Sequence, residues 1–447
     1  MSSYAEKSAR LMSAIAQASA ADGPIVGLSK RTSNLFRDRA PRRSRVDLAH
    51  FDAVIAVDPD AGTVEAEGMT KFVDLADATL AHGTMPAVVP ELKSITLGGA
   101  VAGVGIEATS FRHGLVHDTI VAMDILTGDR RIVHCTADNE HRDLFFGFPN
   151  SYGTLGYALK LVARTLPVKR HVRIDHARRA DPGRFFDDLA RACADDANDF
   201  VEGVVFARDD LVLSSARFVD AAPWISDYTY ERIYYRSLRE KATDYLTTRD
   251  YLWRWDTDWF WCSKNLGAQH PLLRRVFGRK RLNSITYQRI MRWNTRAGIT
   301  SAINRWRGIH SESVIQDVDI PIARAAEFLD FLHEEVGILP IWVCPIRAPD
   351  RNAEPTLYRL PRGTLSVNFG FWDTVPSRER RPAGFLNRKI ERRVQDAGGI
   401  KSLYSDSYFD EYEFWSIYNR AAYEALKARY DPRNDLGDLY AKVVLRR

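Results

Sequence analysis

Short apolar stretches alternate with turn-forming residues along the first part of the chain. Residues 51–68 ("FDAVIAVDPDAGTVEAEG") predict two strands joined by a Pro-Asp-Ala-Gly turn, and residues 117–136 predict a second hairpin that turns at residues 127–129. Residues 71–83 have helical spacing and end at a glycine, and residues 156–167 predict a strand that stops at a proline. Residues up to about 170 are therefore expected to form an α+β domain.

The pattern changes after residue 170. The predicted elements are, in order, a strand (172–177), a helix (182–196), a strand pair (199–220), a strand (312–320), a helix (323–337) and two strands (339–346 and 364–373). This order predicts an antiparallel sheet with helices on one face, interrupted by an insertion at about 224–306. We expect three parts: residues 1–170, a second domain over 171–400, and a mostly helical segment over 401–447.

Composition narrows the class of protein. The 447 residues carry a formal net charge of +5 and are 45% hydrophobic, which is typical of a globular protein and does not favour nucleic acid as the main ligand. The four cysteines are scattered without a Cys-x-x-Cys motif, so we expect no metal site and a reducing compartment. The start of the chain does not resemble a signal peptide, and no long apolar run follows, so a cytoplasmic protein is expected.

One glycine-rich stretch needs explanation. Residues 94–115, "SITLGGAVAGVGIEATSFRHGL", contain five glycines. Such a stretch either packs closely against another backbone or wraps around a diphosphate, which backbone groups reach where side chains are missing. Residues 103–108 fit a GxGxxA fingerprint, but they lead into a turn and a hairpin and not into the helix of a βαβ unit, which disfavours a Rossmann domain. Two further loops, 27–34 and 150–159, favour a dinucleotide held in extended form.

These residues carry a resemblance to a known family. The runs "VPELKSITLGGAVAGVGIEATSFRHGLVHDTI" and "CTADNEHRDLFFGFPNSYGTLGYALKLVARTLPVK" resemble the PCMH-type FAD-binding domain of the vanillyl-alcohol oxidase superfamily. Within it, the chain is most similar to the delta(24)-sterol reductase family, and family-like pieces such as "VIQDVDIPI", "LPIWVCPI" and "LYSDSYFDEYEFW" continue downstream. The resemblance implies a two-subdomain FAD-binding domain followed by an antiparallel-sheet substrate domain, or cap, with a helical, aromatic-rich insertion and a C-terminal segment that returns to the flavin.

The resemblance also implies which residues bind FAD. Those assigned to the pyrophosphate are Thr96, Leu97, Gly98, Gly99 and Ala100. Those along the ribityl chain toward the ring are Gly103, Gly105, Ile106, Ala108, Thr109 and Ser110, and those at the adenosine half are Gly153, Thr154, Gly156 and Ala158. The family's first pyrophosphate loop corresponds to Lys30, Arg31, Thr32, Ser33 and Asn34. This loop offers no histidine or cysteine for covalent attachment, so non-covalent FAD is expected.

Reduction of an isolated carbon–carbon double bond needs a hydride and a proton. Reduced flavin supplies the hydride, and a protein acid must supply the proton, because an unactivated alkene has no carbonyl group to stabilise a carbanion. The candidate acids are Tyr404, Asp406, Glu107 and His117. Each has a structural alternative: Tyr404 and Asp406 could belong to a capped loop before a helix, with Asp406 or Ser407 as the cap, Glu107 could pair with an arginine, and His117 could be a structural hydrogen-bonding group. Glu202 could face the cleft, and Asn368 could orient substrate or flavin.

The implied activity is reduction of a lipid alkene with NADPH as electron donor. The family includes reductases of methylene-branched fatty acyl chains, so 10-methylene to 10-methyl acyl reduction (tuberculostearate-type) is the favoured substrate. Arginine outnumbers lysine, as in proteins of GC-rich bacteria, which disfavours a sterol. The alternatives are a delta(24)-sterol-like reductase, an FAD-linked oxidase of a sugar or lipid-linked alcohol, and a lipid-binding protein without activity. A separate methyltransferase would make the methylene substrate.

The insertion suggests a surface for membranes. Its stretch "YLWRWDTDWFWCSKNLGAQHPLLRRVFGRKRL" holds four tryptophans followed by a basic run at residues 274–281. Tryptophan favours the headgroup level of a bilayer, and Arg and Lys attract anionic lipid. The expected location is therefore the inner face of the cell membrane, with peripheral attachment. The alternative is a helix buried by aromatic packing whose charged end is solvated.

Overall fold

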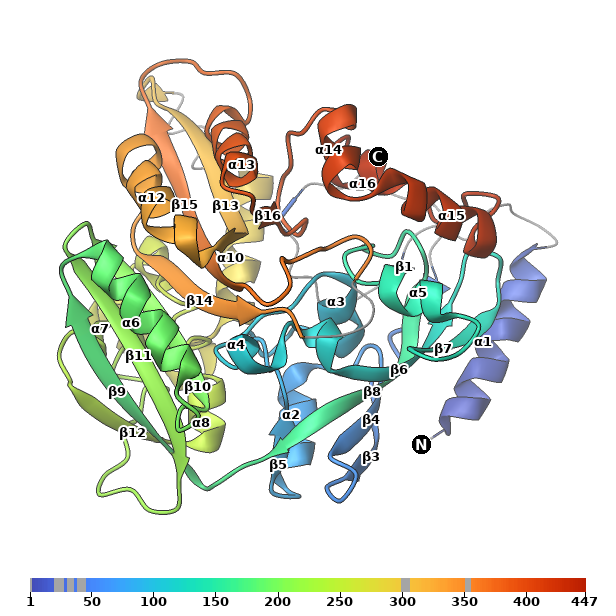
Figure 1. The fold of residues 1–447 in the computed structure, drawn as a ribbon, viewed down its shortest axis with the longest axis horizontal. Coiled ribbons are helices and arrows are strands. Elements are labelled where there is room, and N and C mark those ends of the chain that lie inside the picture. The colour runs from blue at the N-terminus through green and yellow to red at the C-terminus, as the bar shows by residue number, and fades with distance from the viewer. Residues whose placement is uncertain (1, 20–27, 30–35, 38–45, 299–305, 350–354) are drawn as a thin grey trace.

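Two large antiparallel sheets and the helices around them make up the fold (Figure 1). The computed structural model describes residues 2–19, 28–29, 36–37, 46–298, 306–349 and 355–447. In the part of the chain it describes, no helix is long and apolar enough to cross a membrane. The predicted α+β class with antiparallel sheets is confirmed.

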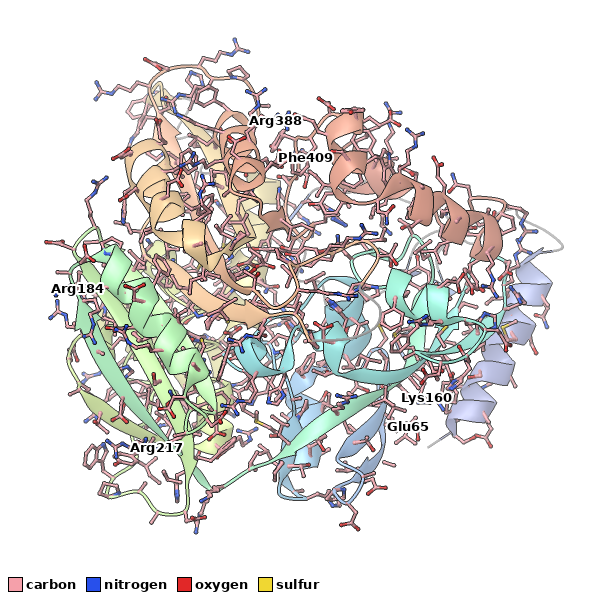
Figure 2. All side chains as sticks on the ribbon, viewed as in Figure 1. Glu65, Lys160, Arg184, Arg217, Arg388 and Phe409 are labelled. Atoms are coloured by element: carbon pink, nitrogen blue, oxygen red, sulfur yellow. The ribbon has the colours of Figure 1, made fainter. Side chains whose placement is uncertain are left out.

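The first sheet contains six strands in the order β3-β4-β8-β6-β7, with β5 on the edge of β8. Both predicted hairpins are present, β3 with β4 and β6 with β7. In each, a local turn joins two alternating stretches, which then pair as antiparallel strands. The strands are β3 (Val54–Asp58), β4 (Thr63–Glu67), β5 (Thr84–Pro86), β6 (Ile120–Leu126), β7 (Ile132–Thr136) and β8 (Tyr157–Pro167), and a separate parallel pair is β1 (Leu28–Ser29) with β2 (Val46–Asp47). Figure 2 labels Glu65 and Lys160, which form an ion pair of 2.7 Å between β4 and β8.

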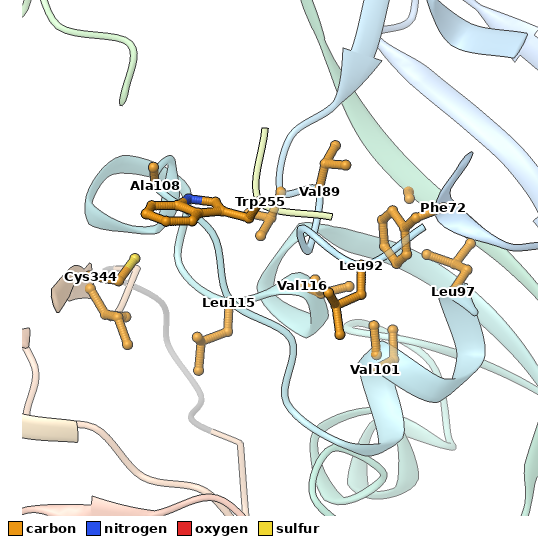
Figure 3. Close-up of a cluster of buried hydrophobic side chains, with 14 of the residues drawn as sticks. Phe72, Val89, Leu92, Leu97, Val101, Ala108, Leu115, Val116, Trp255 and Cys344 are labelled. Atoms are coloured by element: carbon orange, nitrogen blue, oxygen red, sulfur yellow. The ribbon is translucent and has the colours of Figure 1, made fainter. Parts of the chain in front are cut away.

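Short helices surround this sheet. They are α1 (Tyr4–Ser19), α2 (Phe72–Leu80), α3 (Leu97–Ala102), α4 (Ser110–His113), η1 (Val116–Thr119) and α5 (Arg142–Gly147). The glycine-rich stretch, whose apolar residues would also suit a strand, begins with the helix α3. Thr96 caps it, accepting a hydrogen bond from the Gly99 amide at 3.3 Å. Leu97 and Val101 of α3 pack in a buried cluster that also holds Trp255 and Cys344 from the second half of the chain (Figure 3).

The second sheet has eight strands in the order β12-β9-β11-β10-β14-β15-β13-β16. These are β9 (His171–Arg179), β10 (Phe200–Ala207), β11 (Asp210–Val219), β12 (Thr243–Thr247), β13 (His310–Pro321), β14 (Ile341–Arg347), β15 (Leu365–Ser377) and β16 (Ile400–Lys401). In Figure 1, α6 (Pro182–Ala194), α12 (Ala325–Phe331) and α13 (Phe385–Asp396) lie on one face, and η4 (Ile322–Arg324) and η5 (Leu332–Val336) flank α12. This is the predicted architecture of a sheet with helices on one face.

Alternation along the strands gives the two faces of this sheet different characters. On β13, Val318 and Ile320 pack with the helices, in the same cluster as Phe328 of α12 and Ile390 of α13. The residues between them therefore point to the opposite face, toward the first domain. On that face the strand carries Asp317 and Asp319, which follow Ile315 along the strand.

The structure of the insertion at about 224–306 contradicts one prediction. Its elements are α7 (Tyr234–Ser237), α8 (Thr248–Leu252), η2 (Cys262–Leu266), α9 (Pro271–Phe277), η3 (Arg279–Arg281) and α10 (Ser284–Ala297). Trp253, Trp255, Trp259 and Trp261 lie in turns and are buried, each 6% exposed or less. The prediction that these four tryptophans face a membrane is therefore wrong: Trp255 and Trp261 pack on each other, and Trp261 also packs on Trp372 of β15.

The C-terminal helices pack on the first domain. They are α14 (Glu411–Ile417), α15 (Arg420–Tyr430) and α16 (Leu439–Val443), and in Figure 1 they lie above α5. The Lys427 ammonium donates to the Thr154 carbonyl at 3.2 Å, and the Lys442 ammonium donates to the Tyr152 carbonyl at 2.7 Å. The tail is thus tied to the loop at residues 150–156, one of the glycine loops that the sequence analysis identified.

Candidate functional site

A cavity of about 610 Å³ lies between the two domains. The first domain lines it with α3, the residues after α3, and the loop at 150–156. The second domain lines it with β13, β14 and β15, the C-terminal segment adds Ser402 and Tyr404, and the insertion adds Trp259 and Phe260. One wall is therefore glycine-rich backbone, and the opposite wall is aromatic and carboxylic.

The glycine-rich wall fits a nucleotide. Of the residues assigned to FAD, those that line the cavity are Thr96, Gly98, Gly99, Ala100, Gly103, Gly105, Ile106, Gly153, Gly156 and Ala158. A Cβ on Gly98 would lie 2.9 Å from the Gly68 carbonyl oxygen, and one on Gly103 would lie 2.9 Å from the Gly99 carbonyl oxygen, so side chains there would distort the wall. Tyr152 and Gly153 both have positive φ (48° and 78°), a backbone arrangement that concentrates at ligand-binding loops.

The amides of α3 have partners within the protein. The Gly98 amide donates to the Gly68 carbonyl at 2.9 Å and the Ala100 amide to the Thr96 carbonyl at 2.8 Å. Their contribution to a bound nucleotide is therefore close approach of the backbone and not a free N–H group. Cationic side chains are supplied elsewhere: Lys442 and Arg447 at the end of the chain line the cavity, which the sequence analysis missed.

Five other residues assigned to FAD do not line the cavity. Leu97 is buried in the core, the Ala108 carbonyl accepts from the Val201 amide, the Thr109 and Thr154 hydroxyls donate to nearby carbonyls, and the Ser110 hydroxyl accepts from the Glu107 amide. They shape the loops behind the wall. Lys30, Arg31, Thr32, Ser33 and Asn34 lie outside the described residues.

Gly98→Ala tests the fit of this wall. We expect the FAD content of the purified protein to fall, because the methyl group meets backbone atoms at 2.9 and 3.2 Å that cannot yield without moving α3 away from β4. Overpacking of this kind costs about 1–3 kcal/mol, or roughly five- to a hundredfold in affinity. The flavin-to-protein absorbance ratio during titration with FAD measures it. Gly183→Ala is the matched control, since its new Cβ meets only the end of the Asp181 side chain at 3.3 Å; equal FAD affinity in the two variants would contradict the assignment.

The opposite wall holds a carboxyl group beside a phenol. Asp317 and Tyr404 both line the cavity, and the indole of Trp372 donates to the Tyr404 hydroxyl at 3.1 Å. Burial raises the pKa of Asp317 to about 8, even though a hydrogen bond from Tyr404 lowers it, and the nearby Asp319 raises it further. Within the described part of the chain, Asp317 Oδ1 is buried and has no hydrogen-bond partner. Asp317 therefore faces the cavity, and its burial favours the protonated form of the carboxyl group at neutral pH.

Asp319, two residues along the same strand, has a different environment. The Tyr358 hydroxyl donates to its Oδ2 and the Asn368 amide donates to its Oδ1, both at 2.7 Å. Burial raises the pKa of Asp319 to about 6, and these two hydrogen bonds oppose that rise. The ionised form of Asp319 is consequently favoured at neutral pH, and its hydrogen bonds link β13 to Tyr358 and to Asn368 of β15. At Asp317 the protonated form is favoured.

A second carboxylate cluster lies deeper. Arg254 is fully buried and donates to Glu107 at 2.8 Å and to Glu202 at 3.0 Å, while the indoles of Trp255 and Trp342 donate to Glu202 at 3.0 and 2.9 Å. Glu91 lines the cavity, and burial followed by the charge of Glu107 raises its pKa well above the usual range. This cluster connects the first domain, the second domain and the insertion.

The four predicted acids have different surroundings. Tyr404 lines the cavity. Glu107 is paired with Arg254, His117 lies 3.7 Å from Asp118, and Asp406 lies 3.2 Å from Arg446, and the side chains of these three do not line the cavity. The structural alternative for Asp406, a helix cap, is also not met, because Asp410 caps α14. Asn368 lines the cavity, as one of its predicted roles requires.

Asp317, Asp319 and Glu91 line the cavity but were not predicted from the sequence as site residues. The signal for the first two was available: "SVIQDVDIPI" places two acids at i and i+2 within an apolar strand, so both must face one side of the sheet. For Glu91 the signal was a single acid after the apolar run "AVVP". Lys442 and Arg447 gave no signal, because only tertiary packing brings the end of the chain to the cavity.

Comparison with known proteins agrees with this geometry. Residues 3–136 match the family model described as an FAD binding domain. Delta(24)-sterol reductase of Homo sapiens is 24% identical over 412 residues, covering 87% of this chain and 76% of that protein, and the enzyme of Arabidopsis thaliana is 24% identical over 438 residues, covering 90% and 76%. Cytokinin dehydrogenase 7 of Oryza sativa is 29% identical over 174 residues, covering 38% and 32%. The chain is an FAD-dependent oxidoreductase that is similar to delta(24)-sterol reductases along most of its length, and the resemblance seen in the sequence is confirmed.

Proposed function

We propose that this protein reduces a branched carbon–carbon double bond of a lipid, with the proton delivered from the Asp317–Tyr404 pair. The observation that carries the proposal is the carboxyl group of Asp317, which lines the cavity across from the glycine-rich wall with its Oδ1 buried, an environment that raises its pKa to about 8. A reductase of an isolated alkene needs such an acid, whereas an alcohol oxidase needs a base. The same group therefore supports reduction over the alternative of an FAD-linked oxidase.

The residues would act in a defined order. Asp317 donates its proton to the less substituted alkene carbon, which leaves a tertiary cation at the branch carbon. FAD held against the glycine-rich wall of Gly98, Gly103 and Gly153 would supply, in its reduced form, hydride chemistry to the branch carbon. Tyr404, held by the Trp372 indole, donates a hydrogen bond to the Asp317 carboxyl group and keeps it in position. The aromatic faces of Trp259, Phe260 and Trp372 exclude water from the cation and stabilise it.

The substrate class follows from this chemistry. Protonation is easiest where it yields a tertiary cation, as in a 10-methylene fatty acyl chain or in the side chain of a delta(24)-sterol. We favour the 10-methylene acyl chain, which becomes a 10-methyl chain, with NADPH as the electron donor and a methyltransferase as the enzyme that supplies the alkene. The sterol stays the second candidate because the relatives that match most of the chain are named delta(24)-sterol reductases.

Anaerobic incubation with NADPH and a 10-methylene-acyl phospholipid tests the proposal. We expect the lipid to gain two hydrogens by mass spectrometry, and parallel incubations with a delta(24)-sterol separate the two substrates. The control is a 10-methyl-acyl phospholipid, which has no double bond to reduce. An unchanged mass for both alkenes, together with two hydrogens lost from a lipid-linked alcohol, would contradict reduction and support the oxidase.

A further inference from the structure

Two helices of the insertion expose apolar side chains to solvent. On α9, Leu272, Leu273 and Val276 are 65%, 46% and 75% exposed. On α10, Trp293 is 62% exposed. Large apolar side chains exposed on neighbouring elements mark interaction surfaces when polar residues surround them. We call these four residues, with the basic residues beside them, the α9–α10 surface.

The side chains of the segment that holds α9 and α10 carry charge of one sign, and Asp227 from outside the segment pairs with Arg279 at 2.8 Å. Residues 259–311 contain eleven lysines and arginines and no aspartate or glutamate. Exposed cations flank the apolar side chains: Arg275 on α9, Lys280 and Arg281 on η3, and Arg289, Arg292 and Arg296 on α10. On α10 the exposed positions 289, 292, 293 and 296 share one helical face, so Trp293 stands among arginines. Such a surface is complementary to an anionic partner with an apolar interior.

The α9–α10 surface is fixed to the cavity wall. The Arg274 guanidinium donates to both Asp258 carboxylate oxygens, at 2.7 and 2.9 Å. The Tyr287 hydroxyl of α10 donates to the Thr257 carbonyl at 3.0 Å, and the Ser284 hydroxyl donates to Asp256 at 2.6 Å. The next residues along the chain, Trp259 and Phe260, line the cavity. Whatever binds α9 and α10 therefore lies against elements that are continuous with that wall.

We propose that the α9–α10 surface docks the protein on an anionic lipid bilayer, with Leu272, Leu273, Val276 and Trp293 inserted at the headgroup level. Moving aliphatic and indole side chains from water to the interface lowers the free energy of the bound state. The attraction of the flanking cations to the negative surface potential lowers it further. Nucleic acid would use the cations but not three exposed aliphatic side chains. A second copy of the chain would bring the same positive charge and be repelled.

Vesicle co-sedimentation tests the docking independently of any turnover. We expect binding to vesicles of phosphatidylglycerol and phosphatidylcholine, and much weaker binding to phosphatidylcholine alone. Replacing Arg275, Lys280 and Arg281 with glutamine should weaken binding about a hundredfold, since each cation near an anionic surface contributes about a factor of five. Replacing Leu272, Leu273 and Val276 with serine should weaken it roughly ten- to a hundredfold. Tyr412→Ser, at an 86% exposed aromatic residue on α14, is the matched control and should bind like the wild type.

The depth to which the α9–α10 surface inserts into the bilayer is measured separately, with nitroxide-labelled lipid. Tryptophan fluorescence should be quenched in the wild type and quenched less in Trp293→Phe, which also shows insertion if the serine variant does not fold. Three results would overturn the proposal: binding that depends on the cations but not on the aliphatic residues or Trp293, tighter binding to DNA than to vesicles, or a dimer that the serine variant converts to monomers. FAD content and circular dichroism of each variant establish that it is folded.

Discussion

Asp317→Asn is expected to slow lipid alkene reduction by about two to four orders of magnitude, the usual worth of a general acid. Asparagine has nearly the shape of the protonated acid and still accepts a hydrogen bond from Tyr404, but it cannot release a proton. Steady-state turnover of the 10-methylene-acyl phospholipid measures the loss. Asp373→Asn on the same sheet, whose carboxylate lies 3.3 Å from Lys264, removes a charge that does not line the cavity and is the matched control.

The pH dependence of the wild type follows from the same residue. The acid is active when protonated, so the rate should be level below about pH 8 and fall about tenfold per pH unit above it, the pKa that burial gives Asp317. Asp317→Asn should lose this dependence. A wild-type rate that rises through pH 8 would contradict the assignment, because it would require Asp317 to act as a base.

Stability should change with pH in a related way. The folded protein keeps a proton on Asp317 up to about pH 8, whereas the unfolded chain releases it near pH 4. The folded state thus binds more protons between these values, so this residue's contribution to the free energy of unfolding falls as pH rises through the window. The melting temperature of Asp317→Asn should fall less than that of the wild type over this range.

Arg254→Met should be the most destabilising single change outside the sheets. The substitution leaves Glu107 and Glu202 buried without their cation, and breaking a buried ion pair in this way costs about 3–5 kcal/mol. Urea unfolding, followed together with FAD content, measures the loss. The triple variant that also carries Glu107→Gln and Glu202→Gln should recover part of it, because neutral amides are cheaper to bury.

Arg184→Met is the matched control for this change. Arg184, labelled in Figure 2, is exposed on α6, and exposed substitutions alter stability by about 0.5 kcal/mol or less. If Arg254→Met and Arg184→Met unfold at the same urea concentration, the carboxylate cluster does not connect the domains as described.

The sequence predicted the elements whose signals are local. Both hairpins of the first sheet follow from turn residues between alternating stretches, and the face of β13 that carries Val318 and Ile320 follows from strand periodicity. Helix α13 was overlooked although Leu386, Ile390 and Val394 recur every fourth residue, because charged residues dominate the segment. The stretch at α3 looked like a strand since its apolar residues gave no helical amphipathicity.

The site was harder to predict because it is assembled from distant segments. Tyr404 could be found from a resemblance, but its partners Asp317 and Trp372 are separated from it by 87 and 32 residues. The pKa of Asp317 depends on burial that only the packed sheet creates. The buried tryptophans show the same limit, since composition alone does not distinguish a membrane-facing ring from a packed one.

The role of Asp317 is tested most directly by a single anaerobic turnover, with enzyme whose FAD has been reduced before mixing with the 10-methylene-acyl phospholipid. The return of oxidised-flavin absorbance gives the rate, and mass spectrometry identifies the lipid. The wild type should form a lipid two hydrogens heavier, at a rate that falls above about pH 8, while Asp317→Asn with the same FAD content should be slower by about a hundredfold or more. Equal rates for the two proteins at every pH would show that Asp317 is not the proton donor.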